Sequence, residues 1–132
     1  KLKKFGKLVA DFVDQEGTNE AMQEFVNPLA ELGDKVTKLS TEIGMKAFAN
    51  ADEAGAAAVD YLRVCGHLVF AYFWARMAKV ALAKQGSGDP FYTAKVATAR
   101  FYFAKLLPET AGLIRSARSG AAPLMAMDEA MF

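Results

Sequence analysis

The residues of this chain best suited to chemistry are a single cysteine and a single histidine, Cys65 and His67. A haem-attachment motif would need a second cysteine directly before the histidine, and Gly66 occupies that position. A metal site in a helical bundle needs several inward-facing histidine or glutamate ligands. Cys65 has no second histidine or nearby base that would hold it as a thiolate. We therefore expect His67 to be packed with one hydrogen-bond partner, and we expect no catalytic, cofactor-binding or metal-binding residue in this chain.

The arginines are better candidates for a function. An arginine beside a packed aromatic helix can bind a carboxylate or phosphate of a partner through its planar set of donors. The chain offers such residues at Arg63, Arg76, Arg100, Arg115 and Arg118. The ordinary alternative is that these side chains solvate the surface, as most arginines do.

The composition is that of one globular domain. The chain has 132 residues, of which 53% are hydrophobic and 23% charged, and its formal net charge is +1. A nucleic-acid-binding domain would show clustered lysines and arginines, so we expect no nucleic-acid partner. The unpaired Cys65 indicates a reducing compartment, and we expect a cytoplasmic location. Because the first residue is Lys1 rather than methionine, we expect an excised piece of a longer protein.

The most apolar run extends from Val64 to Ala75. A membrane-spanning helix needs about 20 apolar residues, and Arg76 and Lys79 interrupt this run too early. We therefore expect a buried central helix and no membrane span.

Helical spacing of apolar residues extends through almost the whole chain. Pro28 falls inside the second pattern and predicts either a kink or a helix restart capped by Asn27. Asp52 is a possible cap for the third helix, and the apolar stretch from Ala121 is expected to pack on a neighbour. The predicted helices cover residues 1–13, 18 or 19 to about 49, 54–84 and 90–119. Their short connections favour antiparallel neighbours, so the predicted fold is all-α, an up-down bundle of about four helices in one domain over residues 1–132.

The helix from residue 90 has the clearest boundaries. Asp89 can cap its first turn, and Pro90 suits the first helical position, where no N–H is needed. Pro108 cannot donate to the helical ladder and is expected to bend the helix. Gly120 suits the left-handed position that ends it. The apolar side of this helix is aromatic and its polar side basic, which indicates that other helices cover it.

Two segments carry a resemblance to a known family. The first is Tyr61-Leu62-Arg63 with Gly66-His67 and the aromatic run to Trp74, and the second runs from Phe91-Tyr92 through Lys95 and Arg100 to Leu107-Pro108. Together they resemble the extra C-terminal domain of one branch of the acyl-CoA dehydrogenases, which includes the 3-methylmercaptopropionyl-CoA dehydrogenases of bacteria. The resemblance is strong over residues 54–118 and weaker over residues 1–53.

The resemblance implies a context for this chain. The full enzymes bind FAD and oxidise acyl-CoA to 2-enoyl-CoA, a glutamate taking the α-proton and the flavin a β-hydride. Those parts precede this domain, so the fragment itself would be non-catalytic and without a cofactor, in a bacterial cytoplasmic protein. It would pack on the catalytic core of the parent chain or across a homo-oligomer, and it would meet acyl-CoA through the parent. Arg63, Arg76, Lys95 and Arg100 would then be candidates for docking contacts or for contacts with CoA phosphates.

One short segment competes with this reading. Glu16-Gly17-Thr18-Asn19-Glu20 resembles the segment that holds the catalytic glutamate in this superfamily, and Glu16 would then be the base. The residues before it do not follow the family's pattern, and the stronger resemblance over 54–118 places the catalytic glutamate before Lys1. Gly-Thr-Asn is also ordinary helix-start chemistry.

A function from a different class stays open. The chain could be a free-standing helical bundle that acts as an interaction module or a small lipid-binding module. Aromatic residues such as Phe70, Phe73, Trp74, Phe101 and Phe103 are too many for one small bundle to bury on all sides. This surplus favours a face that is covered by another part of an assembly.

Overall fold

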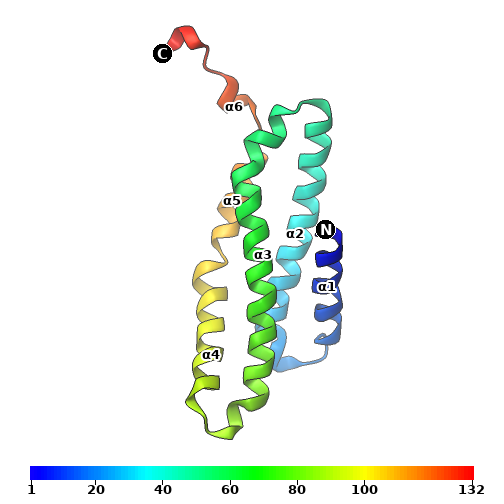
Figure 1. The fold of residues 1–132 in the computed structure, drawn as a ribbon, viewed down its shortest axis with the longest axis vertical. Coiled ribbons are helices and arrows are strands. Elements are labelled where there is room, and N and C mark those ends of the chain that lie inside the picture. Colours follow the sequence, from blue (N-terminus) through cyan, green and yellow to red (C-terminus); the bar gives the residue numbers. More distant parts are fainter.

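The computed structural model describes residues 1–132, which form helices and turns without any strand. Long helices run antiparallel, and a shorter first helix lies beside them (Figure 1). The predicted all-α up-down bundle is confirmed. The helices are α1 (Leu2–Gln15), α2 (Gln23–Ala49), α3 (Asp52–Lys84), α4 (Pro90–Phe101), α5 (Glu109–Arg118) and α6 (Ala122–Met125), with 3₁₀ turns η1 (Glu20–Met22), η2 (Gln85–Ser87) and η4 (Glu129–Met131) and a π-helical turn η3 (Tyr102–Leu106).

Helix α3 lies at the centre of the bundle. It packs against α2 on one side and against α4 and α5 on the other, while α1 packs on α2. The inward face of α3 is rich in alanine, and Ala71, Ala75 and Ala78 are fully buried there. Small side chains let neighbouring helices approach closely, so larger residues of α2 such as Phe25 and Leu29 fill the interior. The expected buried central helix is therefore confirmed for one face of α3.

The helix ends follow local chemistry, with some corrections. The Asp89 carboxylate accepts a hydrogen bond from the Phe91 amide at 2.9 Å, so the predicted cap of α4 is confirmed. Two glycines have a left-handed backbone: Gly88 before α4, with φ of 84°, and Gly120 after α5, with φ of 80°. The prediction of Asp52 as a cap is wrong. The Asn50 carboxamide oxygen instead accepts from the Asp52 amide at 3.1 Å, so Asp52 already lies in the first turn, where its charge suits the helix dipole.

Helix α2 also corrects an expectation. Pro28 lies inside a helix that continues from Gln23 to Ala49, so a restart capped by Asn27 does not occur. Asn19 begins η1 but does not cap it with its side chain, and its carboxamide instead donates to the Glu16 carboxylate at 3.1 Å.

Pro108 interrupts the last long helix, as predicted, but through a change of winding. The predicted single helix 90–119 is divided into α4, the π-helical turn η3 and α5. Pro108 has no N–H, and within η3 the Leu107 amide donates to the Tyr102 carbonyl five residues earlier, at 2.9 Å. A π turn adds one residue to the winding, and this alters which side chains of α5 face α3.

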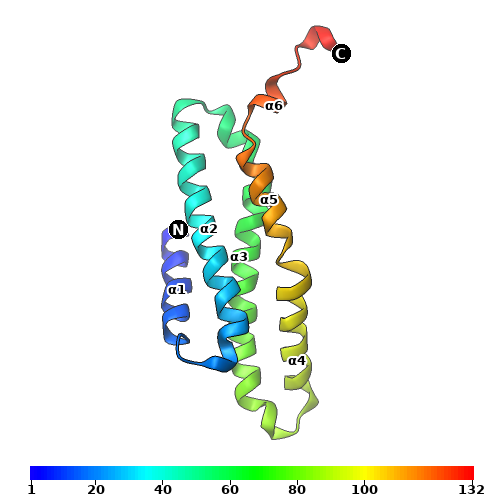
Figure 2. The same cartoon turned by 180° about the vertical axis from the view of Figure 1, so that it is seen from behind.

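The C-terminal segment leaves the bundle. Every residue from Ala122 to Phe132 is exposed, and the segment projects beyond the end of the bundle where α2 joins α3 (Figure 2). Within this chain it packs on nothing. That it packs on a neighbour therefore stays a prediction.

Candidate functional site

The structure divides the predicted basic contact residues into two pairs. Arg63 and Arg100 are held inside the chain by carboxylates. The Arg63 Nε lies 2.7 Å from Glu109 of α5, and Arg100 binds Glu24 of α2 with both Nε and a terminal nitrogen, at 2.7 and 3.0 Å. The bond to Glu24 raises the pKa of Arg100 further. These two arginines connect helices of the bundle, while both side chains stay more than half exposed, so contact with a partner remains a prediction for them.

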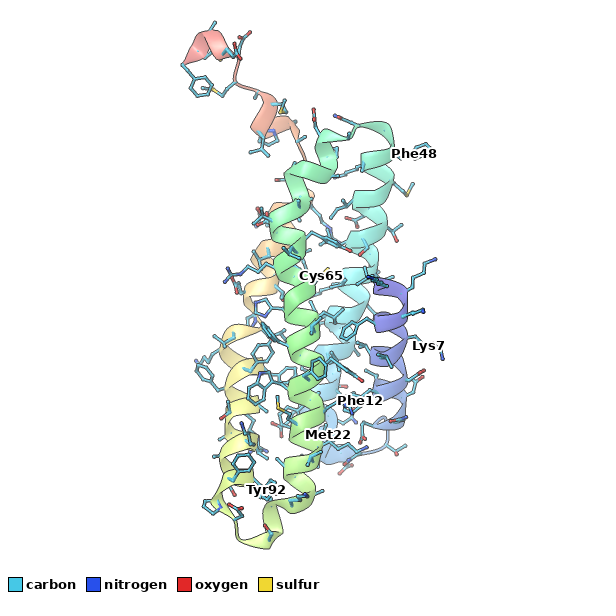
Figure 3. The ribbon with its side chains drawn as sticks, viewed as in Figure 1. Lys7, Phe12, Met22, Phe48, Cys65 and Tyr92 are labelled. Atoms are coloured by element: carbon cyan, nitrogen blue, oxygen red, sulfur yellow. The ribbon has the colours of Figure 1, made fainter.

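Arg76 and Lys95 are the other pair, and neither forms an ion pair with a carboxylate. They lie together on a groove of about 440 Å³ between the C-terminal half of α3 and the first half of α4. Tyr92, labelled in Figure 3, belongs to this groove near the end of the bundle where α3 leads to α4. The remaining lining is mostly apolar, from Phe73, Met77, Val80, Ala81 and Phe91. We call this the α3–α4 groove.

Aromatic rings position the cations of the groove. The Arg76 guanidinium lies 5.6 Å from the centre of the Tyr72 ring, and the Lys95 ammonium lies 5.3 Å from Phe91 and 5.9 Å from Trp74. Cation–π contacts of this kind orient a side chain without neutralising it. The groove therefore combines an apolar floor with two cations at its rim. Such a surface suits an amphipathic ligand that carries negative charge.

The outward face of α3 is apolar and uncovered. At 100° per residue, its exposed large side chains fall on one side of the helix, opposite the buried alanines. Phe70 is 59% exposed and Leu62 is 73% exposed, values that belong to surface rather than core positions. We call this face the α3 stripe, and it comprises Val59, Leu62, Val69, Phe70, Phe73, Met77 and Val80. The C-terminal end of the stripe forms one wall of the α3–α4 groove.

Gly66 lies on the same side of α3 as the α3 stripe. A side-chain carbon added at Gly66 would meet no atom within 4 Å, so no other helix of this chain approaches it closely.

His67 forms a buried polar network beneath the stripe. Its Nδ1 lies 2.9 Å from the Tyr102 hydroxyl and its Nε2 lies 2.9 Å from the Glu109 carboxylate, whose other oxygen binds Arg63. His67 therefore has two side-chain partners, and the expectation of one is corrected. The network joins α3 to η3 and α5.

Tyr102 contacts His67 at two atoms. The Tyr102 hydroxyl lies within hydrogen-bond distance of the His67 carbonyl oxygen, at 3.1 Å, and of the His67 Nδ1, at 2.9 Å. The ionised Glu109 carboxylate can only accept, so the Nε2 of His67 carries the hydrogen of the bond between them. The hydrogen bond from His67, with a further bond from Arg63, lowers the pKa of Glu109. Burial, with the nearby Glu109 charge, raises the pKa of Tyr102 above its usual range.

Glu16, the alternative candidate for a base, lies in a structural ion pair. It is 3% exposed, and its carboxylate binds the Lys79 ammonium of α3 and accepts from the Asn19 carboxamide. The bond to Lys79 is the largest cause of the lowered pKa of Glu16. The Gln23 carboxamide donates to the Glu16 carbonyl at 2.8 Å, which fixes the same turn. This cluster attaches the α1–α2 connection to α3, and it does not line the α3–α4 groove.

The remaining candidates carry no reactive group. Cys65 is half-buried, and burial raises the pKa of its thiol, which favours the neutral form. Arg118 binds Glu42 at 2.8 Å, whereas Arg115 is exposed and forms no ion pair. No group of three or more histidine, cysteine, aspartate or glutamate side chains is placed to hold a metal ion. None of the helices combines the length and apolar content that crossing a membrane requires.

Sequence reasoning found the basic residues but missed their partners. Glu109 follows Pro108 and looked like an ordinary acidic residue at a helix start. Its role depends on the winding of η3, for which Pro108 is the only local signal. Lys79 was noted only as a residue that interrupts an apolar run, because its partner Glu16 is 63 positions away.

The chain matches a known protein family. The family described as "Acetyl-CoA dehydrogenase C-terminal like" matches residues 5–128, which cover nearly the whole bundle. No curated protein matches the chain.

Proposed function

The chain belongs to the acetyl-CoA dehydrogenase C-terminal-like family, and we propose that it serves as the non-catalytic helical domain by which a FAD-dependent acyl-CoA dehydrogenase holds its assembly together. The family assignment agrees with the resemblance over residues 54–118. We further propose that the parent belongs to the 3-methylmercaptopropionyl-CoA dehydrogenase-like branch and works in a bacterial cytoplasm. The reaction of the parent would be oxidation of an acyl-CoA to a 2-enoyl-CoA.

The α3 stripe is the observation that carries this proposal. A contiguous apolar face on the central helix of a small domain is costly to leave in water, and such faces are typical of interfaces. We propose that the stripe packs on the catalytic core of the parent chain or on a second protomer. Within the domain, the bonds of His67 to η3 and α5 hold α3 in place. A rigid support of this kind keeps the stripe in one shape for docking.

The four basic residues have two different roles in this proposal. Arg63 and Arg100 stabilise the domain internally, through Glu109 and Glu24. Arg76 and Lys95 have free charges and an apolar floor between them, so they are the residues we propose for contact with an acidic group of a partner. CoA phosphates, reached through the parent, are one such group.

The flavin would be held outside this domain. The chain contains no strand and no Gly-rich loop that follows one, which is the usual way to cradle a dinucleotide pyrophosphate. We therefore propose that FAD is held elsewhere in the parent, and we assign no step of the oxidation to this chain.

The test is the intact mass and the visible spectrum of the native gene product. A polypeptide several times this length, with flavin absorbance that an acyl-CoA bleaches, is the expected result. A colourless product of about 132 residues would overturn the proposal.

The free-standing binding module is the second candidate, and the α3–α4 groove is the observation that favours it. A module of that kind would be a monomer that binds an anionic amphiphile in the groove. Sedimentation of the colourless product, with and without a fatty acyl-CoA as the probe, would identify it by an unchanged monomer mass and saturable binding. An assembly domain should instead self-associate through the α3 stripe.

A further inference from the structure

We propose that the α3–α4 groove binds the C-terminal segment Ala122–Phe132 of a second copy of this chain. The proposal does not depend on the identity of the parent reaction. It concerns the α3–α4 groove and the C-terminal segment, which have no binding partner within the chain, and it proposes that each binds the other between two copies.

The C-terminal segment has the chemistry of a ligand. Phe132 is 93% exposed and Leu124 is 66% exposed, and Met125, Met127 and Met131 are also exposed. The charged residues of the segment are Asp128 and Glu129, and it contains no lysine or arginine. Asp128 accepts a hydrogen bond from the Ala130 amide at 3.1 Å, which begins the turn η4. The segment therefore presents apolar side chains next to two negative charges.

The groove has the complementary chemistry. Its floor holds aromatic rings, from Phe73, Phe91 and Tyr92, and methionine sulfur makes favourable contacts with such rings. Its rim carries Arg76 and Lys95, neither of which has a carboxylate partner within the chain. Opposite charges at the rim of an apolar contact set orientation and suppress wrong partners. Two acidic residues beside a methionine-rich segment match two cations beside an aromatic floor.

The acidic residues of the segment cannot reach the middle of the groove of their own chain. Its base is fixed where the Ala121 amide donates to Glu53 at 3.1 Å, near the start of α3. Met77 of the groove lies 24 residues further along α3, which at 1.5 Å per residue is about 36 Å. Asp128 is seven residues beyond Ala121, and an extended chain of that length spans about 25 Å at most. Figure 1 shows the segment leaving the opposite end of the bundle from the α3–α4 connection.

The segment of one copy can reach the groove of a second copy when the two bundles lie antiparallel. The start of α3 in one copy, with the C-terminal segment beside it, is then adjacent to the end of α3 in the other copy. The groove lies at that end. An antiparallel pair related by a two-fold axis forms the same contact twice, which is the commonest symmetry of homo-oligomers.

The test is photocrosslinking in the full-length gene product. Met131→benzoylphenylalanine places the probe in the segment, and mixing ¹⁵N-labelled with unlabelled protein distinguishes crosslinks between copies from those within one chain. The expected crosslinks join residue 131 of one copy to residues 73–95 of the other. Reversal of the groove charges, R76E/K95E, should lower their yield by roughly tenfold.

A charge exchange makes the test specific. D128K/E129K should also lower the yield of crosslinks. The segment that carries both residues is exposed within its own chain, so the substitutions leave the bundle unaltered. Mixing the R76E/K95E protein with the D128K/E129K protein should restore the crosslinks, because each groove then meets a segment of opposite charge. The matched control is K105E/R115E, which makes the same charge change outside the groove and should leave the yield unchanged.

Several outcomes would overturn the proposal. Crosslinks confined to one isotopic species, crosslinks to another surface, or no recovery in the mixture would each exclude exchange of the segment. If R76E/K95E weakens binding of an acyl-CoA probe while D128K/E129K changes neither that binding nor the crosslinks, the groove takes the small molecule instead.

Discussion

Tyr102→Phe tests the buried network that joins α3 to the last helices. The substitution keeps the ring, which lies at 5% exposure, and removes the hydroxyl alone. That hydroxyl lies within hydrogen-bond distance of both the His67 carbonyl and the His67 Nδ1. Without it, the buried Nδ1 of His67 has no partner. We therefore expect a loss of stability from an unsatisfied polar atom rather than from a cavity.

The magnitude follows from the kind of group left unpaired. A buried polar group without a partner costs about 1–3 kcal/mol. For a chain of this length, 1 kcal/mol corresponds to a change in Tm of about 3–5 °C. The expected change for Tyr102→Phe is therefore a fall in Tm of about 3–15 °C.

Urea and thermal unfolding, followed by circular dichroism, measure this effect. Tyr92→Phe is the matched control, because the Tyr92 hydroxyl forms no hydrogen bond within the chain and its loss should change stability by less than about 0.5 kcal/mol. Equal stabilities for the two variants would refute the stabilising role assigned to the Tyr102 hydroxyl. An unchanged slope of the urea transition would show that the difference arises from stability and not from a looser fold.

Three further predictions concern other parts of the molecule. Glu16→Gln leaves the Lys79 ammonium without its buried counter-charge and should lower the free energy of unfolding by about 1–3 kcal/mol, measured in urea. The lowered pKa of Glu109 means that its contribution to stability is present above its ordinary value near 4.5 and is lost as the pH falls through the lower folded-state value. The free energy of unfolding should therefore fall as the pH drops below the ordinary glutamate value, and it should fall less steeply in Glu109→Gln. An equal slope in both proteins would contradict a stabilising role for the Glu109 carboxylate. Leu62→Ser with Phe70→Ser should reduce self-association in sedimentation experiments with little change in Tm, since both side chains of the α3 stripe are mostly exposed.

Much of the fold was accessible from local chemistry. The Asp89–Pro90 start and the Gly120 end depend on properties of single residues, and the structure bears out both. The same holds for the interruption at Pro108, because a residue without an N–H breaks the ladder wherever it stands. What local chemistry could not give was the winding of η3.

The candidate site was accessible only in part for the same reason. The bond between His67 and Glu109 joins residues 42 positions apart and requires one extra residue in the turn between Tyr102 and Leu106. The meeting of Arg76 and Lys95 depends on how α4 returns along α3, which no spacing within one helix encodes. Which arginines pair with a carboxylate of the same chain likewise depends on how the helices pack.

The unequal faces of α3 also have a consequence for how this domain can change over evolutionary time. Its inward alanines leave no space for larger side chains, so that face is restricted to small residues by contact with α2 and α4. Its outward phenylalanines have no such neighbour within the chain. A surface of that composition would vary in step with whatever covers it, substitution answered by substitution across the contact, rather than drift toward polar residues as free surface does. The inward face of α3 would then be constrained by helices of its own chain, and the outward face by the surface of another part of the assembly.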